Sequence, residues 1–361
     1  MTAETIKANG EHIPVAAGDI KTQDGVLNEQ TSSPENQIIQ VTFPKLDVGD
    51  AIHLRYKRKM LKLMLPTGSS DAFTFGTNLI FDNVNVSIES PSGMQIAIDT
   101  NRVKQVEDKT TGTQRIRRWH YQNTDTETPE PYVVNSWRST PYLMWSTFEN
   151  WKAIADGYQK GVAEKAVITP QIRELAAKIT AGKTSRKDQV EALYDWVRLN
   201  IRYVASYVGN GGFVPHDTAS ILEHHYGDCK DHATLLEALL QAQGIESSQA
   251  LIPMDLDNYS LYKIPHFMFN HVITYIPSLN LFLDSTSEKA PFGILPKVDS
   301  DKPVLLTKNF TAPGKTPAIT PDSMKQVQRV KIQLAADGSA VRTTEVDNHG
   351  LLTIDARVFL D

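Results

Sequence analysis

The segment Gly227-Asp-Cys-Lys-Asp-His-Ala-Thr-Leu-Leu-Glu-Ala-Leu-Leu-Gln-Ala-Gln-Gly244 is the clearest helix signal in the chain. Its apolar residues recur at spacings of three and four, and Gly244 supplies a C-terminal stop. The pattern predicts a helix that begins at Cys229, the single cysteine of the chain, after a glycine that permits a tight turn. The apolar face consists of Ala233, Leu236, Leu239 and Leu240.

Two short strands joined by a turn are expected after this helix. Apolar patterns predict strands at residues 271–276 and 281–284, and Pro277-Ser-Leu-Asn280 between them is typical of a hairpin turn. In an antiparallel hairpin the start of one strand lies beside the end of the other. We therefore expect the side chains of His271 and Asp284, which stand at those two ends, to meet.

Three further helices are predicted before Cys229. Large apolar side chains recur at helical spacing from Trp145 to Tyr158. Thr169-Pro170 combines an N-cap with a proline at the first helical position, and a third helix is predicted from about Ser185 to Tyr203. Stripes of this kind are far more often core than cofactor sites. Helices followed by antiparallel strands, the first of them at residues 249–252, predict an α+β domain over residues 141–320.

β-structure is predicted on both sides of that domain. Over residues 1–140 apolar and polar residues alternate, as at Ile52 and Leu54, which predicts half-buried strands of an antiparallel sandwich. Over residues 321–361 two alternating runs flank Asp337-Gly338, a strong hairpin signal. The apolar run at residues 351–360 is expected to be a strand of a third domain that continues beyond the sequence.

Composition argues against several classes of function. The 361 residues include 42 acidic and 37 basic side chains, for a formal charge of −5. We expect no nucleic-acid partner, because phosphate binding needs a basic excess or a basic face. No run approaches the ~18 apolar residues needed to cross a bilayer, and the first residues lack the apolar core of a signal peptide.

Cys229 stands where a cysteine can act as a nucleophile. The thiolate is the reactive form, and the free N–H groups and dipole of a helix N-terminus favour negative charge. Such a site needs a base and a group that orients the base, for which His271 and Asp284 are the candidates. Taken singly, the three have ordinary explanations: a buried structural cysteine, a core histidine and a turn at Asp284-Ser285-Thr286.

A second interpretation groups four residues near the start of the helix as metal ligands. Histidine and cysteine are common zinc ligands. Their spacing matches neither C-x-x-C nor H-E-x-x-H, so we favour the nucleophile and predict no metal site and no cofactor. The four residues are His224, His225, Cys229 and His232.

The run Asp255-Leu-Asp-Asn258 is acidic but too short for a calcium loop with EF-hand spacing. It lies in the long connection between the Cys229 helix and the strand that begins at His271. Some connections of this length act as active-site lids, and plain surface excursions are at least as common.

Three motifs resemble those of one protein family. Tyr226-Gly-Asp-Cys-Lys-Asp-His-Ala-Thr-Leu-Leu235 resembles the nucleophile motif of the bacterial transglutaminase-like superfamily. Phe269-Asn-His-Val-Ile-Thr-Tyr275 resembles its histidine strand, and Phe282-Leu-Asp-Ser-Thr286 its aspartate strand. Upstream, Val41-Thr-Phe-Pro-Lys-Leu-Asp-Val-Gly-Asp50 resembles part of a β-rich domain of unknown function that precedes this core in many envelope or secreted bacterial proteins.

The resemblance implies a papain-like core with Cys229 as nucleophile, His271 as base and Asp284 as orienting group. It also implies a longer natural protein, located in the periplasm, in the cell envelope or outside the cell. His232 stands where many relatives carry lysine, so it either tunes Cys229 or faces solvent. The candidates for oxyanion or substrate contacts, besides the backbone N–H of Cys229, are Tyr203, Tyr207, Gly227 and Asp228.

Three functions are compatible with these residues. The leading hypothesis is a cysteine peptidase or amidase, in which water hydrolyses a thioester formed on Cys229 from a protein or peptide substrate. The same three residues would serve a protein-glutamine transglutaminase if an amine reached the thioester first. A non-catalytic binding module of a multidomain envelope protein is the third hypothesis. It fits the flanking β-domains, although binding alone has no physical need of all three groups.

Overall fold

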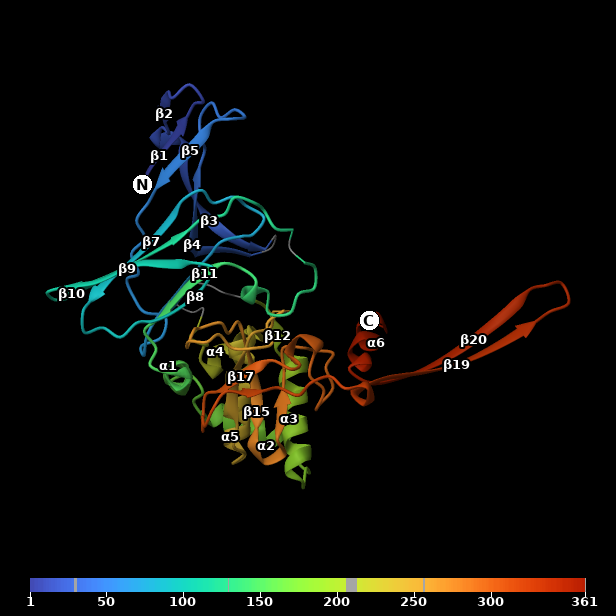
Figure 1. Ribbon diagram of the computed structural model, residues 1–361. Coiled ribbons are helices and arrows are strands. Elements are labelled where there is room, and N and C mark those ends of the chain that lie inside the picture. The colour runs from blue at the N-terminus through green and yellow to red at the C-terminus, as the bar shows by residue number, and fades with distance from the viewer. Residues whose placement is uncertain (29–30, 129, 206–212, 256, 361) are drawn as a thin grey trace. The chain divides into compact units, whose positions relative to one another are not determined.

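A computed structural model describes residues 1–28, 31–128, 130–205, 213–255 and 257–360 (Figure 1). Among these residues no helix is long and apolar enough to span a membrane. The chain divides into a compact unit of Met1–Met64 and a larger one that holds most of the remainder. This division does not fall at residues 140 and 320, so the three predicted domains stay a prediction.

The smaller unit consists mainly of antiparallel β-structure. Its strands are β1 (Thr2–Ile6), β2 (His12–Pro14), β3 (Ile20–Asn28), β4 (Thr31–Val41) and β5 (Ala51–Arg55). β1 pairs with β2 and β5, and β3 pairs with β4. The strand expected around Ile52 and Leu54 is present as β5. The prediction that its apolar face is buried is wrong, since Ile52 is 53% exposed and Leu54 is 43% exposed. No hydrophobic cluster of the described residues includes side chains of these strands.

The first part of the larger unit is also β-structure. Its strands are β6 (Ser70–Thr74), β7 (Val84–Pro91), β8 (Ala97–Asn101), β9 (Lys104–Thr111), β10 (Gln114–Tyr121) and β11 (Tyr142–Ser146). They form two antiparallel sheets, with the orders β6-β11-β8 and β7-β10-β9. Side chains from both sheets share one hydrophobic cluster around Trp119 and Leu143. Burial between the sheets therefore holds this part together.

The helix expected from residue 145 begins later than the apolar spacing indicated. Trp145 lies in β11 and pairs with strands on both sides. Helix α1 (Trp151–Ala163) follows Asn150, whose side chain accepts a hydrogen bond of 3.0 Å from the Ala153 N–H. The boundary lies there because an asparagine in extended backbone satisfies a free N–H group of the first helical turn.

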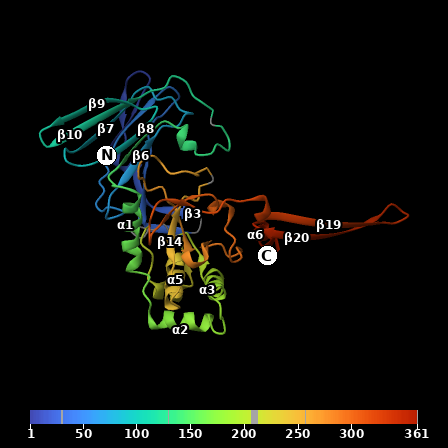
Figure 2. The same cartoon turned by 60° about the horizontal axis from the view of Figure 1, so that its bottom comes forward.

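The three motifs belong to an antiparallel sheet with helices packed beside it, which confirms the α+β fold (Figures 1 and 2). The elements are α2 (Pro170–Ile179), α3 (Arg186–Asn200), β12 (Arg202–Tyr203), α4 (Thr218–His224), β13 (Tyr226–Gly227), α5 (Cys229–Ala242), β14 (Ser248–Ile252), β15 (His271–Ile276), β16 (Leu281–Leu283), β17 (Pro303–Leu306) and β18 (Gly314–Lys315). The sheet order is β16-β15-β14-β17-β18. Helices α2, α3 and α5 pack with β15 and β16 around Tyr194 and Leu236. Twelve of the fourteen residues of α5 are buried, so this helix is enclosed on all sides and holds its first residue in place.

The last part of the chain confirms one prediction and overturns another. β19 (Met324–Leu334) and β20 (Ala340–Gly350) form the expected hairpin, with Gly338 in the left-handed region at φ 87°. The strand expected at residues 351–360 is wrong, because α6 (Leu352–Leu360) is a helix. Leu351, Ile354 and Val358 recur at helical spacing, and that period was the stronger signal.

Candidate active site

Cys229 is the first residue of α5, as predicted, and the turn before it is a capping box. The Asp228 carboxylate accepts a hydrogen bond from the Asp231 N–H, and the Asp231 carboxylate accepts one from the Asp228 N–H at 3.2 Å. The cap fixes the helix N-terminus, whose free N–H groups and dipole attract negative charge. The backbone N–H of Cys229 has no carbonyl partner within the helix and is therefore suited to face an oxyanion.

Gly227 occupies a position where a side chain would collide with this cap. A Cβ added there would lie 2.6 Å from the Asp231 Cβ atom. We therefore expect Gly227→Ala to displace Asp231 and to lower the free energy of unfolding by about 1–3 kcal/mol in denaturant titrations. Gly93→Ala is the control, because an added Cβ at Gly93 meets open space. Equal stability of the two variants would contradict this role of Gly227.

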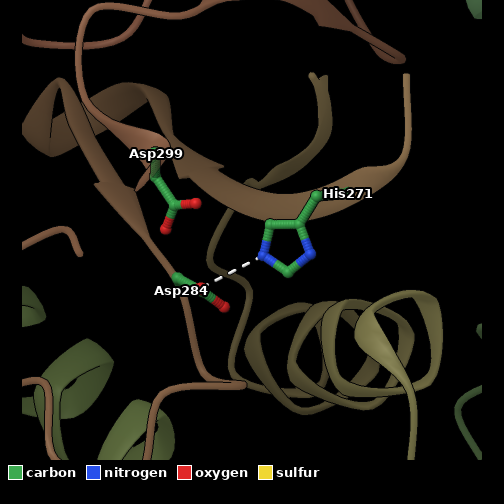
Figure 3. Close-up of side chains that lie close together, drawn as sticks. All are labelled: His271, Asp284 and Asp299. Carbon is green, nitrogen blue, oxygen red and sulfur yellow. Dashed lines mark hydrogen bonds and ion pairs between the residues drawn. The ribbon is translucent and has the colours of Figure 1, made fainter. Parts of the chain in front are cut away.

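His271 and Asp284 meet as the predicted hairpin required. His271 is the first residue of β15, and Asp284 directly follows β16. Because Thr274 pairs with Leu283, the register continued outward places His271 and Asp284 diagonally on one face of the hairpin. His271 Nε2 lies 3.1 Å from Asp284 Oδ2 (Figure 3), and both side chains are buried.

The ion pair changes the pKa of both groups. Burial alone would lower the pKa of His271, but the charge of Asp284, its hydrogen bond and the Cys229 side chain raise that pKa well above its usual value. Burial alone would raise the pKa of Asp284, but the charge and hydrogen bond of His271 hold that pKa well below its usual range. Thr286 donates to Asp284 Oδ1 through its N–H at 2.9 Å and its hydroxyl at 2.7 Å. The site therefore favours an imidazolium beside an ionised carboxylate.

The other ring nitrogen of His271 is left for Cys229. Nδ1 is buried and has no well-aligned hydrogen-bond partner among the described residues. The Cys229 side chain interacts with the His271 ring, and only 6% of Cys229 is exposed. Cys229, His271 and Asp284 are thus all buried, with His271 paired to Asp284 and the pKa of His271 raised in part by the Cys229 side chain.

A buried polar network that the sequence did not reveal anchors α5 behind the cysteine. Tyr158 of α1 donates a hydrogen bond of 3.2 Å to Gln249 Oε1 in β14. Gln249 Nε2 donates at 3.0 Å to Thr234 and at 3.0 Å to Glu237, both in α5. Glu237 also pairs with Lys308. Because each buried group has a partner, the network fixes α5 against α1 and β14.

The remaining residues predicted for the site have different places. Tyr203 lies in β12, with its ring 6.1 Å from that of His232 in an edge-to-face contact. His232 does not face solvent, since it is 1% exposed, and burial lowers its pKa, so the ring stays neutral. The Asp228 carboxylate is engaged by the cap and by Lys230, so its side chain is not free for substrate. Tyr207 lies outside the described residues.

The side chains of metal-ligand type that gather within the described ranges are not the four grouped from the sequence. They are His271, Asp284 and Asp299, whose ligand atoms lie within 4.8 Å of one another. None of the histidines near the start of α5 belongs to this group. We interpret the group as the His271–Asp284 ion pair with Asp299 beside it, because His271 is already paired with Asp284.

The long connection between β14 and β15, which includes Asp255 and Asn258, is tied to the core. The buried Lys302 Nζ donates to the Asp255 carbonyl at 2.5 Å and the Asn258 carbonyl at 3.2 Å, and lies 3.9 Å from the centre of the Tyr259 ring. Asn135 Oδ1 accepts a hydrogen bond of 2.9 Å from the Tyr259 N–H. An ammonium group thus sits among these carbonyls, in the role that a bound cation would have. The bonds favour a fixed connection over a lid.

Two family models match the sequence. The model of the transglutaminase-like superfamily matches residues 173–252, and that of a domain of unknown function, DUF3857, matches residues 1–127. The chain carries a transglutaminase-like core. The matched segment contains Cys229, whereas His271 and Asp284 lie beyond it, on the β15–β16 hairpin.

A solved structure shares the architecture of this chain. The crystal structure of "a putative protease from Parabacteroides distasonis" matches 94% of this chain and 67% of that chain, with a TM-score of 0.68 at 14% identity. "A putative cysteine protease from Cytophaga hutchinsonii" matches 78% of this chain and 86% of that chain at 15% identity, but its TM-score of 0.28 is too low to support an argument. The first match confirms the fold alone. No curated protein matches the sequence.

Proposed function

We propose that the transglutaminase-like core is a cysteine hydrolase that cleaves an amide bond in a protein or peptide. The observation that carries this proposal is the buried chain from Cys229 through His271 to Asp284. The hydrogen bond at Nε2 orients the imidazole, and Nδ1 is left to exchange a proton with the thiol. A nucleophile, a base and an orienting group in this order are what thiol acyl transfer needs.

The reaction follows from the position of each group. The Cys229 thiolate attacks the amide carbonyl carbon, the C–N bond breaks, and the leaving amine takes the proton held by His271. Water then attacks the thioester and gives a proton to His271, and breakage of the C–S bond restores the thiolate. Asp284 remains ionised throughout and keeps the ring oriented, while the Cys229 N–H faces the oxyanion.

The identity of the acceptor separates the proposed hydrolase from a transglutaminase. The protein is incubated with a peptide mixture and a labelled primary amine, and products are identified by mass spectrometry. We expect hydrolysed peptides, and we expect their formation to fall in proportion as iodoacetamide modifies the single thiol. Amine incorporation without hydrolysis would instead assign transamidation. Absence of both reactions, with a bound partner that survives alkylation, would favour a binding module.

A location in the periplasm, in the cell envelope or outside the cell is part of this proposal. Its support is the resemblance of residues 41–50 to a domain found in many envelope and secreted bacterial proteins. Fractionation of cells that produce the natural protein tests it, and recovery in the cytoplasm alone would contradict it.

A further inference from the structure

Asp299 is a second buried carboxyl group beside the triad. It is the last residue of the short 3-10 helix Lys297–Asp299, and its surface is 0% exposed. Figure 3 shows its carboxyl group beside Asp284 and His271, and the ligand atoms of the three lie within 4.8 Å of one another. Among the described residues, neither Oδ1 nor Oδ2 of Asp299 has a hydrogen-bond donor.

Two carboxyl groups so close together in a buried site strongly disfavour double ionisation. Asp284 has three donors, the His271 ring and both groups of Thr286, which stabilise its negative charge. Asp299 has no such donor. When only one of the two carboxyl groups is ionised, the charge therefore resides on Asp284 and the proton on Asp299. In agreement, burial and the charge of Asp284 raise the pKa of Asp299 well above its usual value.

The surroundings of Asp299 offer no better partner. The charged groups that face it are Asp284, His271 and Lys302. The Lys302 ammonium is directed to the carbonyl groups of the β14–β15 connection instead. The Thr316 hydroxyl donates at 2.5 Å to the backbone carbonyl of Asp299, which fixes the peptide and does not engage the carboxyl group. An ionised Asp299 would therefore be a buried charge without a hydrogen-bond donor among the described residues, which is far more costly than a neutral acid.

We propose that Asp299 is a positioning residue of the triad that, as a neutral acid, donates a hydrogen bond to the Asp284 carboxylate. This bond adds a donor to Asp284, so that Asp284 stays ionised and the proton taken from Cys229 stays on His271. The inference deepens the proposed function and rests on it for turnover. Its other readouts, alkylation of Cys229 and the infrared spectrum, do not need a substrate.

The experiment compares Asp299→Asn, Asp299→Ala and the control Asp301→Asn. Asparagine is neutral and keeps a donor, so Asp299→Asn should retain activity within about threefold and leave the pH profile of iodoacetamide alkylation unchanged. Alanine removes the donor, and a misplaced Asp284 should lower kcat/KM by roughly 100-fold and slow alkylation near neutral pH. Asp301 pairs with Lys315 at the surface, so its variant should match the parent.

Infrared spectra test the proton directly. The parent and Asp301→Asn should show the band of a protonated carboxyl group at neutral pH, and Asp299→Asn should lack it. Stability gives a third readout. Because folding raises the pKa of Asp299, the parent should lose stability relative to Asp299→Asn as pH rises above about 4.

Specific outcomes would overturn the proposal even if no amide substrate were found. If Asp299 is ionised in the parent, Asp299→Asn removes a negative charge near His271. The alkaline limb of the alkylation profile would then move to lower pH by roughly one unit or more. A metal ligand would be shown if EDTA changed alkylation of the parent but not of Asp299→Asn. Alkylation of Asp299→Ala at the parental rate and pH dependence would remove any link to the triad.

Discussion

Replacing His271 by alanine is expected to lower kcat/KM for amide hydrolysis by roughly 10⁴-fold. The variant loses both the positive charge that holds the Cys229 thiolate and the group that protonates the leaving amine. Because the pKa of His271 is raised, the parent should keep this imidazolium at neutral pH and lose it only in alkaline solution. Initial rates with the peptide identified by mass spectrometry give the measurement, and alkylation of the single thiol should slow in parallel.

His349→Ala is the matched control for this variant. His349 is an exposed residue of β20, outside the cluster of triad residues, so the change should leave the rate within about twofold of the parent. If His271→Ala retained more than roughly a tenth of the parental rate, His271 would not be the base and the contact chain would be structural. An unfolded His271→Ala variant is recognised by circular dichroism, and His271→Gln is then the second test.

Replacing Asp284 by asparagine is expected to weaken the fold as well as the reaction. Removing one partner of a buried ion pair leaves the other uncompensated and costs about 3–5 kcal/mol. The raised pKa of His271 stabilises the folded chain below the unfolded value of about 6.5, and this contribution is lost as pH rises through the folded value. The lowered pKa of Asp284 stabilises the fold above the unfolded value of about 3.9, and this contribution is lost as pH falls through the folded value.

The stability difference between the parent and Asp284→Asn should therefore be largest between about pH 4 and 6.5, and should shrink in alkaline solution. Urea titrations across that range measure it. Asp156→Asn breaks the exposed Lys152–Asp156 pair and should change stability little at any pH. A difference that did not vary with pH would mean that Asp284 supports the fold through packing or hydrogen bonds and not through its charge on His271.

Local sequence signals were sufficient to predict the positions of Cys229, His271 and Asp284 in the fold. The residues that cap the helix at Cys229 lie within three positions of it, because a helix cap is built from neighbours in the chain. The turn between the two hairpin strands contains Asn280 in the left-handed region at φ 47°, which asparagine tolerates better than most residues. A short turn fixes the register, and the register brings His271 to Asp284.

Two predicted elements are wrong because a local apolar pattern is compatible with more than one secondary structure. Trp145 continues a helical spacing backward into β11, where pairing with two neighbouring strands prevails. The hydrophobicity of residues 351–360 suits a buried strand, but the period of their apolar residues is that of a helix, and the segment forms α6. In β11 the pairing satisfies backbone N–H and C=O groups on both sides of the strand.

The sequence by itself determined the α+β core, the cysteine at a helix N-terminus and the hairpin that joins His271 to Asp284, because caps, turns and hydrophobic periods act over a few residues. Only the tertiary structure decided that His232 is buried, that Lys302 holds the connection after β14, and that Asp299 lies beside His271 and Asp284. Asp299 stands in a segment that has the sequence of an ordinary turn. Its burial depends on elements far away in the chain, and burial is what converts an acidic side chain into a neutral hydrogen-bond donor.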